Sequence, residues 1–198
     1  MSEDAEKPAR PGRPPGQAAA SHDKIMEAVF QLLQERSVRD LTMEAVAKQA
    51  GVGKPTLYKW WPSKAALVLA MFHERLAAAP QKAPGASAES NLRAGIRHLI
   101  GSLNGQFGKV MADLIAEGQS DPKLLQDLFD QHISERRAAT LAEIERGKTL
   151  GEFPAGLEAS VALDAIIGAI YLRLLLRLGP LTEEYGQRLV DQVMGLSR

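Results

Sequence analysis

The sequence has no cysteine and few aromatic residues among its 198 positions. The absence of cysteine excludes disulfide bonds and thiolate metal ligands, and it is compatible with a reducing cytoplasm. Only four histidines occur, at His22, His73, His98 and His132, and none of them has the spacing of a metal site. Because no set of nucleophile, general base and oxyanion donors is present either, we expect neither an enzyme nor a bound metal or other cofactor.

Long uninterrupted apolar runs are also absent. The longest candidate for a membrane-spanning helix runs from Val161 to Leu178, and it contains Asp164, Arg173 and Arg177. We interpret it as a buried helix of a soluble protein. The N-terminal residues lack the apolar segment of a signal peptide. We therefore expect a cytoplasmic protein without a membrane partner.

The net charge is zero, with 24 Lys and Arg against 24 Asp and Glu, but its distribution is uneven. From Lys7 to Lys64 there are ten basic and five acidic residues, a balance of +5. From Lys82 to Arg198 there are thirteen and fifteen, a balance of −2. This asymmetry is expected of a protein that attracts DNA with its N-terminal part.

Residues 1–20 are rich in Pro, Gly and Ala and contain no aromatic or branched aliphatic side chain. Because such a segment buries too little apolar surface to become ordered, we predict a disordered basic arm over these residues. Arg10 and Arg13, in the sequence RPGRP, are similar to short arms that enter an A·T-rich minor groove. A tail that only aids solubility is the alternative interpretation.

The segment from Leu41 to Met71 is the most informative part of the chain. Its pattern predicts a helix, a tight turn, a second helix and a third helix. Ala47 is small enough for two helices to approach closely, Gly51 permits a turn with positive φ, and Leu57 anchors the second helix on the first. The arrangement predicts a helix-turn-helix whose second helix enters the major groove of DNA.

The residue types around this skeleton suit contact with DNA. Thr42 and Ser63 occupy N-cap positions, and Pro55 lies near the start of the second helix, where a missing N–H costs nothing. Lysines, hydroxyls and aromatic rings on one short surface fit base edges and phosphates, although a solvated surface is the alternative for any single lysine. The predicted DNA contacts are Thr42, Gly53, Lys54, Pro55, Thr56, Tyr58, Lys59, Trp60 and Lys64, with Arg10 and Arg13 of the arm.

This segment resembles the N-terminal domain of the TetR family of bacterial transcriptional repressors. The resemblance implies that Thr42, Tyr58 and Lys64 hold phosphates and that Lys54, Pro55, Thr56 and Tyr58 approach bases. The residues that carry it are Thr42, Ala47, Ala50-Gly51-Val52, Thr56-Leu57-Tyr58, Trp60-Trp61, Lys64 and Leu67.

One position departs from the family. The family usually has His or Tyr followed by Phe where this chain has Trp60 and Trp61. We expect Trp61 to fill the core position of that Phe, because a larger aromatic ring can replace it with repacking. Trp60 keeps an N–H donor toward the phosphates but cannot carry a charge.

The rest of the pattern predicts helices and no strand. The expected fold is all-α with about nine helices, in a three-helix DNA-binding domain over 21–66 and a helical effector-binding and dimerisation domain over 67–198. Outside the helix-turn-helix pair, we expect helices at 21–36, 63–79, 89–104, 107–119, 122–146, 157–178 and 182–196.

The expected helix over 157–178 is apolar on nearly all sides, so we expect other helices to pack against two of its faces. One face would pack in its own domain and the other on a symmetry mate, as the resemblance to the TetR family also implies. Arg173 and Arg177 are expected to form interface ion pairs or to pack along their stems. The predicted homodimer interface contains Ala165, Gly168, Ala169, Leu172, Leu176, Leu189 and Val193.

The resemblance further implies a palindromic operator and a small-molecule effector that releases it. Ordinary core packing is the alternative for each candidate pocket residue, since pocket linings and cores share the same composition. As a set the candidates favour a small apolar or aromatic effector. They are His98, Leu103, Phe107, Met111, Leu114, Phe129, His132, Ile133 and Tyr171.

Three other functions are alternatives to this one. An enzyme with an all-α body lacks a catalytic set, and an architectural DNA-coating protein would bind without sequence preference. An adaptor with a vestigial DNA-binding domain is disfavoured by the intact Thr42, Tyr58 and Lys64. The sequence leaves open whether DNA binding represses or activates.

Overall fold

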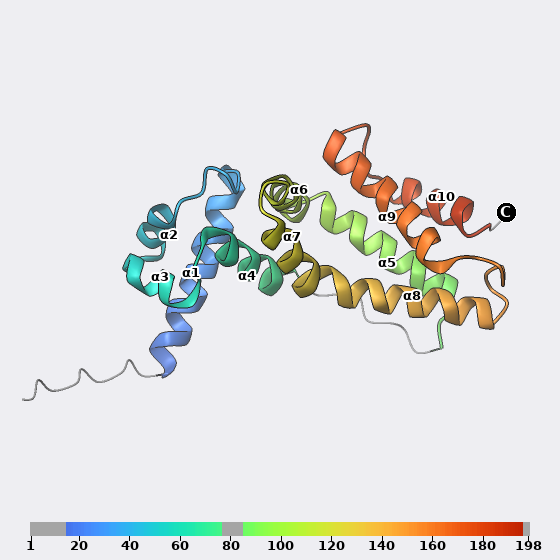
Figure 1. Cartoon of the computed structure of the whole chain (residues 1–198), viewed down its shortest axis with the longest axis horizontal. Helices are drawn as coiled ribbons and strands as arrows, with labels where there is room; N and C mark the ends of the chain where they lie inside the picture. The colour runs from blue at the N-terminus through green and yellow to red at the C-terminus, as the bar shows by residue number, and fades with distance from the viewer. Residues whose placement is uncertain (1–14, 77–84, 196–198) are drawn as a thin grey trace, which may run out of the picture.

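The computed structural model describes residues 15–76 and 85–195, and within these ranges every regular element is helical (Figure 1). Residues 15–76 form a head at one end of the molecule, and residues 85–195 form a body beside it. The predicted all-α fold is confirmed.

The head consists of four helices, α1 (Pro15–Glu35), α2 (Met43–Ala50), α3 (Lys54–Trp60) and α4 (Lys64–Leu76). The long α1 packs across α2 and α4, and α2 packs against α3. α1 therefore connects the short reading pair α2–α3 to α4.

The turn between α2 and α3 has the geometry that its sequence predicts. Thr42 caps α2, because the Ala45 N–H donates to Thr42 Oγ1 at 3.1 Å. Gly51 ends the helix in the left-handed region, with φ of 65°, and directs its N–H back to carbonyls of the last turn. The fully buried Leu57 then holds α3 on the head core.

The body is arranged around α5 (Ala88–Leu103), which packs against α6 (Gln106–Gly118), α8 (Ser134–Thr149) and α10 (Glu183–Val193). The apolar α9 (Ala159–Leu176) packs on α8 and α10 and also meets α6. This arrangement leaves a space between α5 and α8 whose open sides are closed by α6 and α9.

One expected helix, over 122–146, contains an irregularity. α7 (Pro122–Leu128) runs through a π-helical turn, η1 (Phe129–Ile133), directly into α8. Within the widened turn, the hydroxyl of Ser134 donates to the carbonyl of Asp130 at 3.0 Å. The prediction of one regular α-helix here was wrong, because a single wider turn hardly changes the apolar periodicity.

The helix ends also differ from expectation. α1 begins at Pro15 instead of Ser21, since proline suits a first turn and the following Gln and Ala residues favour helix. The arm residues Arg10 and Arg13 lie outside the described residues, as do the expected helix ends at 79 and 196. With α7, η1 and α8 counted together, the described ranges form nine helices.

Among the described helices, α9 alone is long and apolar enough to cross a membrane by length and composition. It packs against α6, α8 and α10 of the body, and Asp164 and Arg173 lie along it. Much of its surface nevertheless stays uncovered by the rest of the chain.

Candidate nucleic-acid interface and internal pocket

The predicted DNA contacts of the head lie on α3 or at the N-terminal ends of α2 and α4. α3 buries Leu57 and turns its other side chains outward, so that Tyr58 is 53% exposed and Trp60 is 43% exposed. The short helix therefore separates a core face from a contact face, and the contact face also carries Lys54 and Lys59. A surface of this shape and composition can enter the major groove.

Lys54 has a partner that the sequence analysis missed. Its ammonium pairs with the carboxylate of Glu44 on α2, and this hydrogen bond lowers the pKa of Glu44. Both side chains are exposed, so the pair is accessible to solvent. The available signal was a Lys at the start of the second helix and a Glu at the start of the first.

Lys64 is held at the start of α4. Its Nζ donates to the carbonyl of Arg39 at 2.9 Å, in the loop that precedes α2. Ser63 caps the helix as predicted, because the Ala66 N–H donates to Ser63 Oγ at 3.1 Å. The ammonium therefore lies close to the end of α2 that Thr42 caps.

The two neighbouring tryptophans lie in different environments. Trp61 is buried in the core of the head, as expected. Trp60 lies 5.8 Å from Trp61 and 5.5 Å from His22 of α1, measured between ring centroids. His22 Nε2 contacts both carboxylate oxygens of Glu74 on α4, at 2.8 and 2.9 Å. Trp60 thus packs on a cluster that joins three helices of the head.

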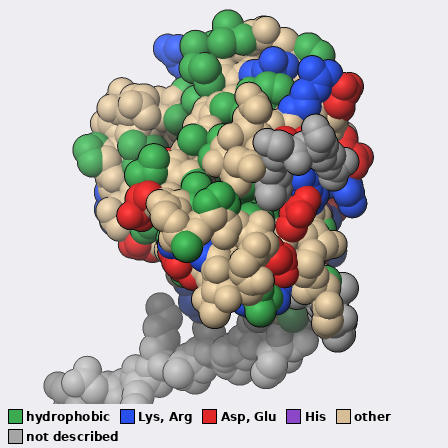
Figure 2. Space-filling model, turned by 90° about the vertical axis from the view of Figure 1, so that its right-hand side faces the viewer, with side chains coloured by type: hydrophobic (Ala, Val, Ile, Leu, Met, Phe, Trp, Pro, Cys, Tyr) green, Lys and Arg blue, Asp and Glu red, His purple; other side chains and the backbone are tan. Residues whose placement is uncertain are grey.

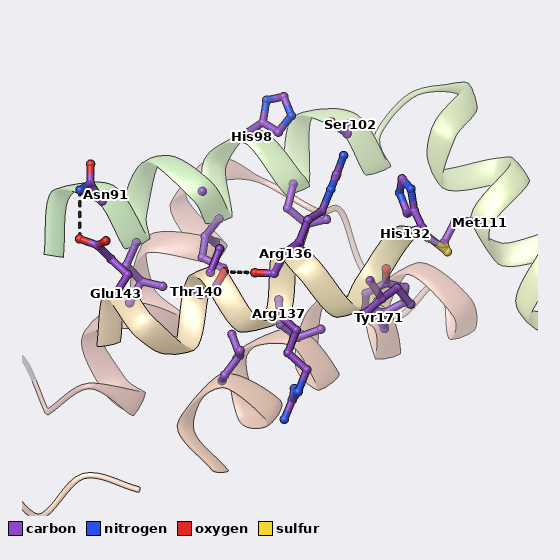
Figure 3. A pocket seen from close by; sticks show the side chains of 18 of the residues that line it. Asn91, His98, Ser102, Met111, His132, Arg136, Arg137, Thr140, Glu143 and Tyr171 are labelled. Atoms are coloured by element: carbon purple, nitrogen blue, oxygen red, sulfur yellow. Dashed lines mark hydrogen bonds between the residues drawn. The ribbon is translucent and has the colours of Figure 1, made fainter. Parts of the chain in front are cut away.

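The body encloses a cavity of about 300 Å³ between α5 and α8 (Figure 3). Six of the nine predicted pocket residues line it, and the other three do not. Leu103 and Leu114 are buried in the core away from this lining, and Phe129 is 42% exposed at the π turn. The six that line it are His98, Phe107, Met111, His132, Ile133 and Tyr171.

The sequence analysis missed most of the polar lining. These side chains come mainly from one face of α8, at spacings of three and four residues that mark a helix face. That spacing was a usable signal once His132 had been chosen as a candidate. The missed polar residues are Asn91, Ser102, Arg136, Arg137, Thr140 and Glu143.

His132 is the most unusual group of this lining. It is 6% exposed, and its Nε2 has no hydrogen-bond partner in the part of the chain that the structure describes. Burial, with smaller contributions from the charges of Arg136 and His73, lowers the pKa of His132 to about 4. The ring is therefore neutral at pH 7, and it packs edge-on against Phe72 of α4 at 4.4 Å between centroids.

The two arginines of the lining point to different places. Arg136 reaches from α8 toward Ser102 of α5, whereas Arg137 turns to the other side of the helix (Figure 3). Arg137 Nη1 pairs with Asp164 Oδ1 at 2.5 Å. Burial lowers the pKa of Arg136, which nevertheless stays protonated at pH 7.

Glu143 closes the other end of the cavity. Its carboxylate is almost fully buried, and it accepts a hydrogen bond from Asn91 Nδ2 at 3.0 Å (Figure 3). It also accepts from Arg146 Nε at 3.0 Å. The negative charge of the lining is therefore already balanced. No group of His, Asp and Glu within the described ranges is placed to hold a metal ion.

Comparison with known proteins assigns both parts of the chain. Residues 25–71 match the family described as bacterial regulatory proteins, tetR family, and residues 83–193 match the tetracyclin repressor-like C-terminal domain. The chain belongs to the TetR family of bacterial transcriptional regulators. It is thus a helix-turn-helix DNA-binding regulator from a family without enzymatic activity.

Relatives of similar length support this membership. An uncharacterized HTH-type transcriptional regulator of Bacillus subtilis, YdeS, is 31% identical over 182 residues, which cover 90% of this chain and 89% of YdeS. The crystal structure of the TetR family transcription regulator SCO0332 is 29% identical, with a TM-score of 0.68 over 90% of this chain and 99% of that one. The fold is also similar to that of FadR from Bacillus subtilis in complex with stearoyl-CoA, at 18% identity and a TM-score of 0.71, over 89% of this chain and 100% of that one.

In this TetR-family regulator, α6 touches both the head and the cavity. Gln106 Nε2 donates to the carbonyl of Phe30 at 2.7 Å, and Lys109 Nζ donates to that of Leu33 at 3.0 Å. Both carbonyls belong to the C-terminal half of α1. Further along α6, Asp113 Oδ2 accepts from the N–H of Val38 at 2.9 Å.

The opposite face of α6 meets the cavity. Phe107 and Met111 line it, and the ring of Phe107 stacks on Phe72 of α4 at 4.6 Å between centroids. A displacement of α6 by a bound molecule would therefore reach α1 through hydrogen bonds and α4 through a ring contact.

An apolar stripe is exposed along α9. Leu172 is 50% exposed and Leu176 is 61% exposed, and Gly168 and Ala165 lie exposed one and two turns before Leu172, respectively. The remaining predicted interface residues, Ala169, Leu189 and Val193, are half-buried. Hydrophobic side chains are interspersed with charged ones on the end of the body seen in Figure 2.

For Arg173 the expected roles were an interface ion pair or packing along its stem, and the structure shows contacts within its own chain. Its guanidinium lies over the ring of Tyr185, with Cζ 3.6 Å from the centroid, and Nη1 donates to the carbonyl of Pro180 at 3.0 Å. These contacts tie the end of α9 to the start of α10 within one chain.

Proposed function

We propose that this TetR-family regulator is a homodimeric repressor that binds a palindromic operator and leaves it when a small apolar or aromatic effector enters the body. DNA binding through the helix-turn-helix follows from family membership. The dimer, the palindrome and the release by an effector are the parts that we add, together with a location in the cytoplasm.

The observation that carries this proposal is the double contact of α6. Its residues Phe107 and Met111 line the cavity, while Gln106 and Lys109 hold the end of α1 and Asp113 holds the loop after it. Because both sets lie on one short helix, a molecule that displaces α6 must change the support of the head.

The release would be a shift of population. A homodimer has two heads, and their spacing must match two successive major grooves. An effector that prefers the mismatched spacing by about 1–3 kcal/mol lowers operator affinity by the corresponding factor. The complex of FadR with stearoyl-CoA supports the idea that a body of this fold accepts a small molecule.

The dimer would form through the exposed stripe of α9. Val161, Leu172 and Leu176 repeat along one side of that helix, with the small Ala165 and Gly168 between them. A large apolar surface of this kind on a soluble protein marks an interaction site, and self-association covers it with the same stripe of a second copy. Light scattering of the purified protein should give twice the mass of one chain.

The DNA contacts proposed for each head divide into two groups. Thr42, Tyr58 and Lys64 would hold phosphates, and the exposed start of α3 would approach base edges. Lys54 would exchange Glu44 for an acceptor on DNA. The base-reading group consists of Gly53, Lys54, Pro55, Thr56 and Tyr58, with Lys59 and Trp60 beside the backbone.

Selection of bound sequences from a random DNA library, with the full-length protein, tests the proposal. Enrichment of a two-fold-symmetric motif is expected, and it would supply the operator for effector screening. Salt-sensitive binding without enrichment would favour an architectural protein instead. Enrichment of a single asymmetric half-site would contradict the homodimer.

A further inference from the structure

His132 lies in the π turn η1 and Arg136 lies four residues further on, in the first turn of α8, and both side chains line the cavity. The imidazole is buried to more than nine-tenths, and its Nε2 has no partner within the described ranges. Buried polar atoms are nearly always hydrogen-bonded in folded proteins, so an exception in a cavity wall indicates a group that awaits a ligand.

A guanidinium charge acts on the unpartnered imidazole. Arg136 brings a charged guanidinium to the middle of the lining, whereas the carboxylate of Glu143 is already bound by Asn91 and Arg146 at the far end. Arg137 adds a second cation, although Asp164 balances it. A cationic ligand is disfavoured here, and an anionic one is attracted.

We propose that the cavity binds a small apolar monocarboxylate, with its carboxylate between the guanidinium of Arg136 and Nε2 of His132. This assignment rests on the proposed function of the cavity as an effector site. The two oxygens of a carboxylate accept from the guanidinium in its preferred geometry and also from an Nε2–H tautomer of the neutral imidazole.

The remaining lining fits the apolar part of such a ligand. Leu92, Ile96, Leu163 and Ile167 contribute aliphatic side chains from α5 and α9. A cavity of about 300 Å³ is at the small end of the range of ligand sites, so it matches a short aliphatic or a monocyclic aromatic acid. Repulsion from Glu143 orients the carboxylate toward the other end.

Calorimetry with the full-length protein and three matched probes tests the ligand class. Octanoate is expected to bind at least about tenfold more tightly than octan-1-ol, because only the acid gains charge-assisted hydrogen bonds, and octylamine is expected to bind more weakly still. Equal or tighter binding of the alcohol or the amine would overturn the proposal, as would an absence of octanoate binding at millimolar concentration.

Two arginine variants locate the contact. Arg136→Gln should lower octanoate affinity by about tenfold and leave octanol affinity nearly unchanged, which also shows that the cavity is still folded. Arg137→Gln is the matched control, since this arginine lines the same cavity but pairs with Asp164. An equal loss of octanoate affinity in both variants would contradict the assignment of Arg136.

Nuclear magnetic resonance of the imidazole gives an independent readout. The charged groups that face His132 are Arg136 and His73, and Phe72 and Phe107 cover the rest of its ring. Octanoate beside the ring should raise the pKa of His132 from its value of about 4, whereas octanol should not. An unchanged pKa with bound octanoate would place the carboxylate elsewhere.

The ligand class and the proposed release can fail separately. Octanoate binding in calorimetry without loss of operator binding in fluorescence anisotropy would contradict the release and keep the ligand class. Release of the operator by octanol or octylamine, with octanoate inert in both assays, would contradict the ligand class and keep the release.

Discussion

The head and the body differ in where they place their candidate functional side chains: the head exposes them, and the body turns them inward. In α3, Leu57 faces the core and the adjacent Tyr58 faces solvent, so the residues that hold the fold differ from those that would meet DNA. Along η1 and α8, His132 and Arg136 face inward, into the same interior that packs the domain. Function should therefore be separable from stability in the head and coupled to it in the body.

The largest effect is expected from the core side of α3. Leu57→Ala removes a fully buried side chain from the junction of α3 with the head, which should lower the free energy of unfolding by about 2–5 kcal/mol. Urea denaturation followed by circular dichroism measures the loss. If this variant kept its stability and lost only operator binding, the separation of the two faces of α3 would be wrong.

In the body, a buried neutral histidine should make stability depend on pH. The pKa of His132 is lowered to about 4 in the folded state and lies near 6.5 in the unfolded state, so only the unfolded chain takes up this proton between the two values. Stability should rise with pH across this window, and the contribution lost between pH 7 and pH 5 should be about 2 kcal/mol.

The variant His132→Phe removes that titration and the unpartnered Nε2. Its unfolding free energy should therefore fall less than that of the wild-type protein from pH 7 to pH 5, as urea denaturation at the two pH values can show. If the unfolding free energy fell by the same amount in both proteins, other groups would be responsible for the pH dependence, and His132 would not weaken the fold.

Much of the head could be predicted because local chemistry sets it. An N-cap at Thr42, a left-handed turn at Gly51 and a proline in the first turn of α3 each act within a few residues of chain. The pairing of Lys54 with Glu44 and the contact of Trp60 with His22 depend instead on how separate helices meet. The sequence pattern alone does not predict how these helices meet.

The body was less predictable for the same reason. Residue type marked His132 and Phe107 as candidates, but it could not distinguish a cavity wall from the core position of Leu114. The π turn adds a residue between α7 and α8, which leaves Phe129 outside and brings Arg136 inside. Because the rotation of a helix about its axis decides which side chains line a cavity, its polar members became visible only in three dimensions.

A smaller effect is expected from the contact side of α3. Tyr58→Ala should reduce operator affinity by about 1–3 kcal/mol, because the exposed ring and hydroxyl would lose contacts with DNA. Its unfolding free energy should change by no more than about 0.5 kcal/mol, as is usual for an exposed position. Wild-type affinity in a gel-shift assay would contradict the assignment of this face.

The smallest difference separates two lysines of the head. Lys54→Ala should relax the base preference of the protein, whereas Lys64→Ala should lower affinity by about the same factor for all sequences and reduce the dependence on salt. The reason lies in their positions, since Lys54 begins the reading helix and Lys64 lies at the start of α4, near the loop before α2. Repeating the library selection with each variant distinguishes them. If both variants kept the same motif with lower affinity, Lys54 would be a backbone contact, and base reading would fall to Thr56 and Tyr58.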